Sequence, residues 1–89
     1  MNPRISMIEE RLRSAFTPLS LDVVDESAQH AGHAGARSGG GHYALTIVAT
    51  QFAGMNPVQR HRMIYQALGD AMHKEIHALS IHAYTPDEL

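Results

Sequence analysis

One stretch of the chain passes from a turn through a helix into a strand: residues 52–78 read FAGMNPVQRHRMIYQALGDAMHKEIHA. Asn56-Pro57 is typical of a helix start, because Asn caps free backbone N–H groups and Pro loses no hydrogen bond at the first helical position. Apolar residues then recur at the spacing of one helix face, at Ile64, Ala67, Leu68, Ala71 and Met72. The stretch predicts helix over 57–74, with 57–60 as a short first piece, followed by a strand.

The rest of the chain predicts one more helix and two more strands. Asn2-Pro3 and an apolar stripe indicate a helix over 2–16, and period-two alternation indicates strands over 19–25, 42–50 and 76–84. The first two strands should pair antiparallel, whereas the last two, joined through a helix, should be parallel. We therefore predict an α+β fold of order α-β-β-α-α-β, with a three-stranded mixed sheet and helices on one face.

Alternation also predicts how the last strand is oriented. His77 shares one face with Leu79, Ile81 and Ala83, and Ile76 lies on the other. Between the first two strands, residues 27–41 read SAQHAGHAGARSGGG. A run so poor in apolar side chains cannot offset the entropy of ordering it, so we expect 28–41 to be a mobile Gly/His-rich loop.

The composition bounds the class of protein. The chain has 89 residues, no Cys, seven His and a formal net charge of −2. It therefore predicts one small domain without disulfides, catalytic thiols or thiolate metal ligands of its own. The charged, amphipathic N-terminal segment is neither a signal peptide nor a membrane span, so we expect a cytoplasmic protein. The acidic charge disfavours nucleic acid as a partner, although protonation of the histidines moves it from −2 towards +5.

Several motifs together resemble the BolA family. They are Phe52-Ala-Gly54, Val58-Gln-Arg60-His61-Arg62-Met-Ile64, Leu68, His77-Ala78-Leu79-Ser-Ile81 and Thr85-Pro86, with Asp25-Glu26-Ser27 and His42-Tyr43 earlier in the chain. The resemblance implies a single BolA-like domain over 1–89 with a class II KH-like fold. It also implies a heterodimer with a monothiol glutaredoxin that shares a [2Fe–2S] cluster, glutathione being supplied by the partner. Some proteins of this family are DNA-binding transcriptional regulators.

Three histidines are the candidate metal ligands. The resemblance assigns His77, at the start of the last strand, and a loop ligand, for which His30 and His33 both compete. His30 lies three residues after Ser27, as the family's loop ligand does after its Glu-Ser, so we favour His30. The alternative for His77 is a histidine at the edge of the core whose nitrogens bond to the backbone. The alternative for His30 and His33 is that they only keep the loop soluble. Two His can replace two Cys on one iron of a [2Fe–2S] cluster, so a chain without Cys needs its partner's sulfur ligands.

Arg60 and Arg62 are candidates for binding a partner's carboxylates, glutathione or nucleic-acid phosphate. His61 lies three residues before Ile64, on the buried stripe, and we expect the two Arg to be exposed on either side of it. The chain shows none of the common catalytic motifs, so we predict a non-enzyme. An iron–sulfur accessory protein is the favoured function, a DNA-binding regulator the second, and Zn or Ni binding by the His-rich loop the third.

Overall fold

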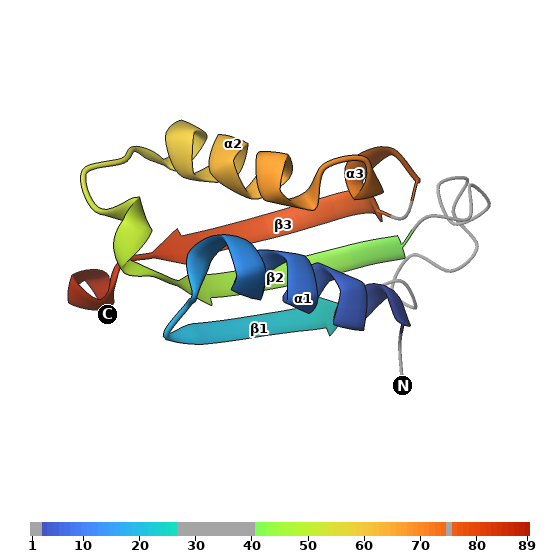
Figure 1. The fold of residues 1–89 in the computed structure, drawn as a ribbon, viewed down its shortest axis with the longest axis horizontal. Helices are drawn as coiled ribbons and strands as arrows, with labels where there is room; N and C mark the ends of the chain where they lie inside the picture. The colour runs from blue at the N-terminus through green and yellow to red at the C-terminus, as the bar shows by residue number, and fades with distance from the viewer. Residues whose placement is uncertain (1–2, 27–40, 75) are drawn as a thin grey trace.

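The computed structural model describes residues 3–26, 41–74 and 76–89, and of His73, Lys74 and His77 the backbone only. Its elements are α1 (Pro3–Phe16), β1 (Ser20–Asp25), β2 (Gly41–Val48), the 3-10 turn η3 (Thr50–Phe52), α2 (Pro57–Leu68), α3 (Ala71–Lys74), β3 (Ile76–Tyr84) and the 3-10 turn η4 (Pro86–Glu88) (Figure 1). The expected loop 28–41 lies almost entirely outside the described residues, apart from Gly41, which opens β2.

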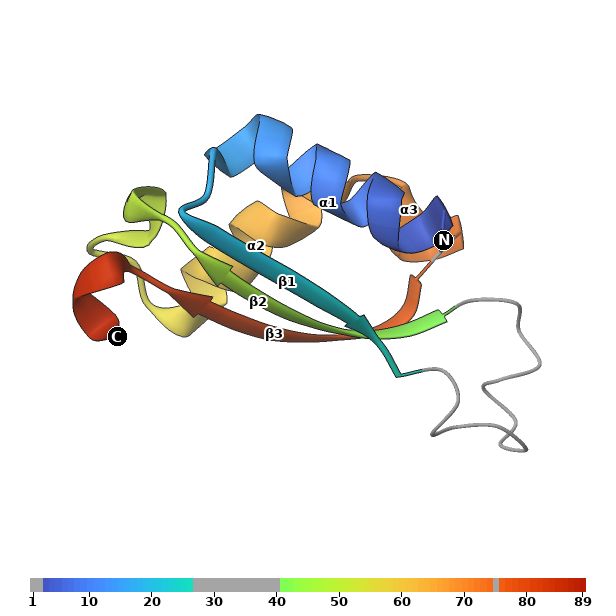
Figure 2. The same ribbon diagram turned by 90° about the horizontal axis from the view of Figure 1, so that it is seen from below.

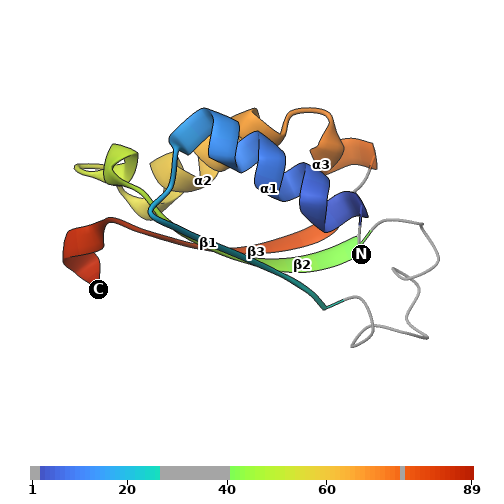
Figure 3. The same cartoon turned by 60° about the horizontal axis from the view of Figure 1, so that its bottom comes forward.

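The three strands form one sheet in the order β1-β2-β3. β1 pairs antiparallel with β2, and β2 pairs parallel with β3, as the sequence predicts. Helices α1, α2 and α3 cover the same face of this sheet, and within the described residues the opposite face carries no helix (Figures 2 and 3). The predicted α+β architecture is confirmed.

The core lies between the helical layer and the sheet. α1 and α2 contribute the residues of their predicted stripes, and β2 contributes its alternate side chains: Ile8, Leu12 and Phe16, then Ile64 and Leu68, then Tyr43, Leu45 and Ile47. The rings of Phe16 and Phe52 pack with centroids 5.1 Å apart, so η3 closes one end of the core. Because β2 is the central strand, it is the most completely buried of the three.

The second helical segment ends earlier than its apolar stripe suggests. α2 stops at Leu68, and α3 begins only at Ala71. Gly69 adopts a φ of 58°, which a residue with a side chain rarely takes, and Arg11 of α1 donates to the freed carbonyl of Leu68. The predicted division near residue 60 and continuous helix to 74 are therefore wrong, although Ala71 is buried as expected.

A one-residue irregularity marks the start of β3. Gly41 pairs with Ile76, but the next residue, His42, pairs with Ala78, which leaves His77 as an additional residue in the strand. The extra residue reverses the alternation, so Ile76 packs into the core on the same face as Leu79. The predicted assignment of Ile76 to the opposite face is wrong, because simple alternation does not allow for a bulge.

Candidate functional site

Three chain segments meet at one end of the sheet. β1 ends at Asp25 there, while β2 and β3 both begin there, with Gly41 beside Ile76 (Figure 1). The backbone N–H of Glu26 donates to the carbonyl of His42 at 2.7 Å, which ties the end of β1 to the start of β2. Glu26 and Gly41, the described residues that flank segment 27–40, therefore lie at the sheet end where β3 begins and where the backbone of His77 is placed. This convergence confirms the expected topology.

Gly41 is tightly packed at this sheet end. The ring of Tyr43 occupies the space that a Cβ at residue 41 would need, and Tyr43 itself is almost fully buried. The start of β2 is therefore held against the core by an aromatic side chain, and a larger residue than Gly at this position would displace it.

An open cavity lies at the same sheet end. Its volume is about 260 Å³, and Glu26, His42, Ala78 and Ser80 are among its lining residues. The Nε2 atom of His42 is shielded from solvent within the described chain. A carboxylate and an imidazole thus line a hollow directly beside the backbone of the proposed ligand His77.

The metal role of the three predicted histidines stays a prediction. His30 and His33 lie outside the described residues, and so does the side chain of His77. Within residues 3–26, 41–74 and 76–89, no group of three or more His, Asp or Glu side chains is arranged to hold a metal ion. His82 is exposed on β3, five residues beyond His77.

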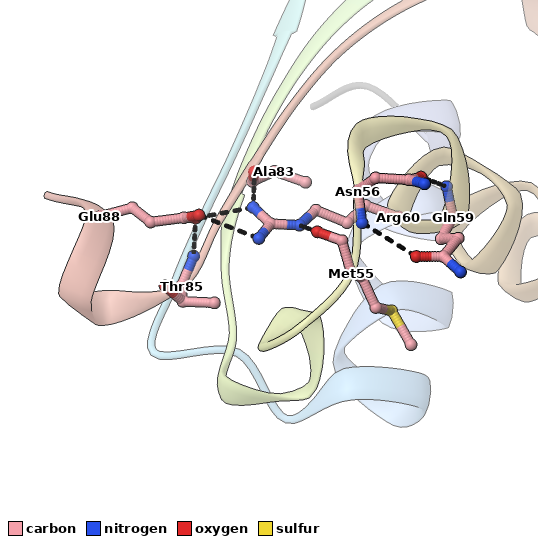
Figure 4. Close-up of polar contacts among 7 residues, drawn as sticks. All are labelled: Met55, Asn56, Gln59, Arg60, Ala83, Thr85 and Glu88. Carbon is pink, nitrogen blue, oxygen red and sulfur yellow. Dashed lines mark hydrogen bonds and ion pairs between the residues drawn. The ribbon is translucent and has the colours of Figure 1, made fainter.

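Arg60 lies at the opposite end of the sheet and is buried, so its predicted exposure is wrong. Its position, four residues before Ile64, puts it on the buried stripe of α2, while His61 is only half-buried. The Arg60 Nε donates to the Met55 carbonyl at 2.9 Å and Nη1 donates to the Ala83 carbonyl at 2.9 Å (Figure 4). Arg62 is exposed, as predicted, and stays a candidate for binding a partner.

Sequence reasoning missed the residue that pairs with Arg60. Glu88 accepts from Arg60 Nη1 at 2.6 Å and Nη2 at 2.9 Å, and from the Thr85 N–H at 2.7 Å (Figure 4). The Arg60 guanidinium, and then the Thr85 N–H, lower the pKa of Glu88 to about 2. The spacing Thr85-x-x-Glu88 is that of a capping box, and it was the available signal for this turn.

Comparison with known proteins assigns the family. The family model described as BolA-like protein matches residues 12–88. The chain belongs to the BolA family. Its BolA-like relatives include the DNA-binding transcriptional regulator BolA of Escherichia coli, which is 44% identical over 91% of this chain and 74% of that protein. SufE-like protein 1 of Arabidopsis thaliana is 45% identical over 92% of this chain but only 24% of its own length.

Solved BolA structures share the fold. The BolA domain of SufE1 from Arabidopsis thaliana superposes with a TM-score of 0.88 at 42% identity, covering 100% of this chain and 99% of that one. The Escherichia coli relative is named as a transcriptional regulator, and one from Mus musculus is named BolA-like protein 1. Within the part of the chain that the structure describes, no helix is long and apolar enough to cross a membrane.

Proposed function

We propose that this BolA-family protein is an iron–sulfur accessory protein that pairs with a monothiol glutaredoxin and shares a [2Fe–2S] cluster with it, in cluster trafficking or iron homeostasis. The observation that carries the proposal is the pairing of Gly41 with Ile76 beside the end of β1. This pairing, with the hydrogen bond between Glu26 and His42, puts the two residues that flank the His-bearing segment at the sheet end where the strand with His77 begins. The backbone alone therefore makes a shared site between loop and strand feasible.

The donor chemistry of the chain fits such a cluster. The sequence has no Cys and seven His, so it offers imidazole nitrogens and no thiolate. Two imidazoles on one iron are an accepted replacement for two thiolates, and the partner would supply the remaining sulfur ligands with its glutathione. His77 and His30 would hold the iron on this side, with His33 as the substitute for His30. The bound cluster could carry electrons, or it could be passed on to another protein.

The test is co-expression with the monothiol glutaredoxin of the same organism, followed by absorption and circular dichroism of the purified pair. We expect His77→Ala to abolish the spectrum of a His-ligated cluster and His30→Ala to weaken it. Only the combined change of His30 and His33 to Ala should match the loss at His77.

The matched control is His82→Ala, because His82 is exposed on the same strand and is not a proposed ligand. It should leave the spectrum unchanged. A complex whose spectrum survives His77→Ala would overturn the ligand assignment and would direct the search to His42, or to a cluster held by the partner alone.

A DNA-binding regulator is the second candidate. It is favoured by the name of the Escherichia coli relative, a DNA-binding transcriptional regulator at 44% identity. In this chain the exposed cation on α2 is Arg62, whereas Arg60 is committed to Glu88. The net charge of −2 counts against a large phosphate footprint. A cytoplasmic location likewise stays a prediction, since some relatives are named as chloroplastic or mitochondrial.

A further inference from the structure

The contacts of Arg60 hold its guanidinium with the Nη1 and Nη2 edge facing outward from the core. The carbonyls of Met55 and Ala83 accept from Nε and Nη1, and the Phe52 ring lies 6.0 Å from the guanidinium carbon. These contacts fix the plane of the group and leave the Nη1/Nη2 edge as a two-pronged donor. Such an edge matches the two oxygens of a carboxylate.

The site needs an anion because the cation cannot be neutralised. The Arg60 side chain is only 11% exposed, and arginine stays charged at any pH at which proteins fold. A buried charge without a counter-ion is strongly unfavourable. The Thr85 N–H adds a third donor aimed at the same carboxylate oxygen that Nη1 contacts.

The carboxylate that fills the site belongs to a lightly held turn. None of the three residues of η4, all within the described chain, is buried, and the Glu88 side chain is 42% exposed. Displacing η4 would therefore uncover no apolar core residue of its own. The hydrogen bonds described between η4 and α2 are those that Glu88 accepts from Arg60.

We propose that Arg60, with the Thr85 N–H, is a carboxylate-binding site that Glu88 occupies from within the chain, and that an acidic side chain of a partner protein binds there when η4 moves away. The site is separate from the proposed cluster site: Ala83 lies six residues along β3 from His77, about 20 Å at the rise of a strand. It thus adds a second docking point to the molecule and does not depend on the cluster.

The test uses thermal unfolding of the full chain carrying Glu88→Ala, in sodium acetate and in sodium chloride of equal ionic strength at neutral pH. We expect acetate to raise the Tm of this variant in a saturable manner and chloride to leave it unchanged. Asp87→Ala is the matched control, since it removes a carboxylate from the same turn that Arg60 does not contact. It should respond to acetate no more than the unaltered protein does.

A second measurement covers the case in which Glu88→Ala unfolds. In Glu88→Gln, titration with the peptide Thr-Pro-Asp-Glu-Leu should shift the backbone amide resonance of residue 85, and the same peptide with Gln in place of Glu should not. The proposal would be overturned by an equal response of Glu88→Ala and Asp87→Ala to acetate. It would also be overturned if the Glu-containing peptide left the amide of residue 85 unshifted, or if both peptides shifted it equally. Phosphate acting as well as acetate would assign the site to oxyanions in general and would overturn its selectivity for carboxylates.

Discussion

At the scale of single residues, Arg60 gathers contacts that are far apart in the sequence. One side chain joins the turn before α2 through Met55, the end of β3 through Ala83, and η4 through Glu88. The arginine therefore connects three separate parts of the fold, and it does so from a buried position in place of the exposed one expected for it. Its place on the buried stripe was available from the sequence, but its partner was not, because Glu88 lies 28 residues away.

The ion pair predicts an acid sensitivity. The pKa of Glu88 falls from 4.5 to about 2, chiefly through the hydrogen bond from Arg60. A carboxyl whose pKa is lower in the folded state stabilises the fold fully above its unfolded pKa, and this stabilisation is lost as pH falls through the folded pKa. We expect Tm to fall between pH 4.5 and about 2 by more in the unaltered protein than in Glu88→Gln.

Thermal unfolding at a series of pH values measures this difference. Asp87→Asn serves as the control, and it should keep the acid sensitivity of the unaltered protein. Parallel pH profiles for the unaltered protein and Glu88→Gln would contradict the proposed ion pair.

At the scale of elements, α2 has a start that is locally encoded and an end that is only partly so. Asn56 accepts from the Gln59 N–H at 2.9 Å, and the Gln59 side chain accepts from the Asn56 N–H at 2.9 Å, which completes a capping box. These residues lie three apart, so the sequence predicts the start correctly. At the end, Gly69 is a local stop signal whose N–H donates to the Tyr65 carbonyl. The Leu68 carbonyl is bonded by Arg11 of α1, a contact that local patterns do not contain.

The cap predicts a measurable loss of stability. Asn56→Ala removes the acceptor for one free N–H of the first turn, and we expect it to reduce the free energy of unfolding by about 0.5–2 kcal/mol. Urea unfolding gives this value directly. Gln66→Ala, at an exposed site in the last turn of α2, should change the free energy by no more than about 0.5 kcal/mol. Equal effects of the two variants would contradict the role of the cap.

The difference between locally encoded and long-range features also explains how much of the candidate cluster site could be predicted. Element order and strand directions were predictable because alternation and connection length determine them, so the arrangement of the end of β1 and the starts of β2 and β3 at one sheet end was predicted correctly. The bulge at His77 was not, since it exists only in the pairing between β2 and β3. The roles of His30 and His33, which lie outside the described residues, rest on the family resemblance and stay predictions.

At the scale of the whole molecule, charge limits what the protein can bind. The chain carries 7 Lys and Arg against 9 Asp and Glu, and one of the Arg, Arg60, is already paired within the fold. A nucleic-acid footprint would therefore depend on a few exposed cations and on protonated histidines. Long-range attraction to phosphate should be weak at neutral pH.

We expect weak, salt-sensitive binding to duplex DNA that strengthens as pH falls and the histidines gain charge. Titration of a labelled duplex at two pH values and two salt concentrations measures it. Arg62→Ala should weaken binding further, whereas Arg13→Ala, which removes an exposed cation from α1, should have less effect. Tight sequence-specific binding at neutral pH and moderate salt would instead favour the regulator as the main function.

The bulge at the start of β3 also bears on insertions and deletions. Removing one residue from a regular strand turns every following side chain to the other face, so such deletions are expected to destroy the sheet. Deleting His77 should leave the sheet intact, because Ile76 and Ala78 already pair with the successive residues Gly41 and His42. The shortened chain should fold with the same core, as judged by amide spectra, while deletion of Ser80 should not fold. A BolA-type sheet can therefore gain or lose the histidine at this position by inserting or deleting one residue, and the sequences before and after the change should both fold.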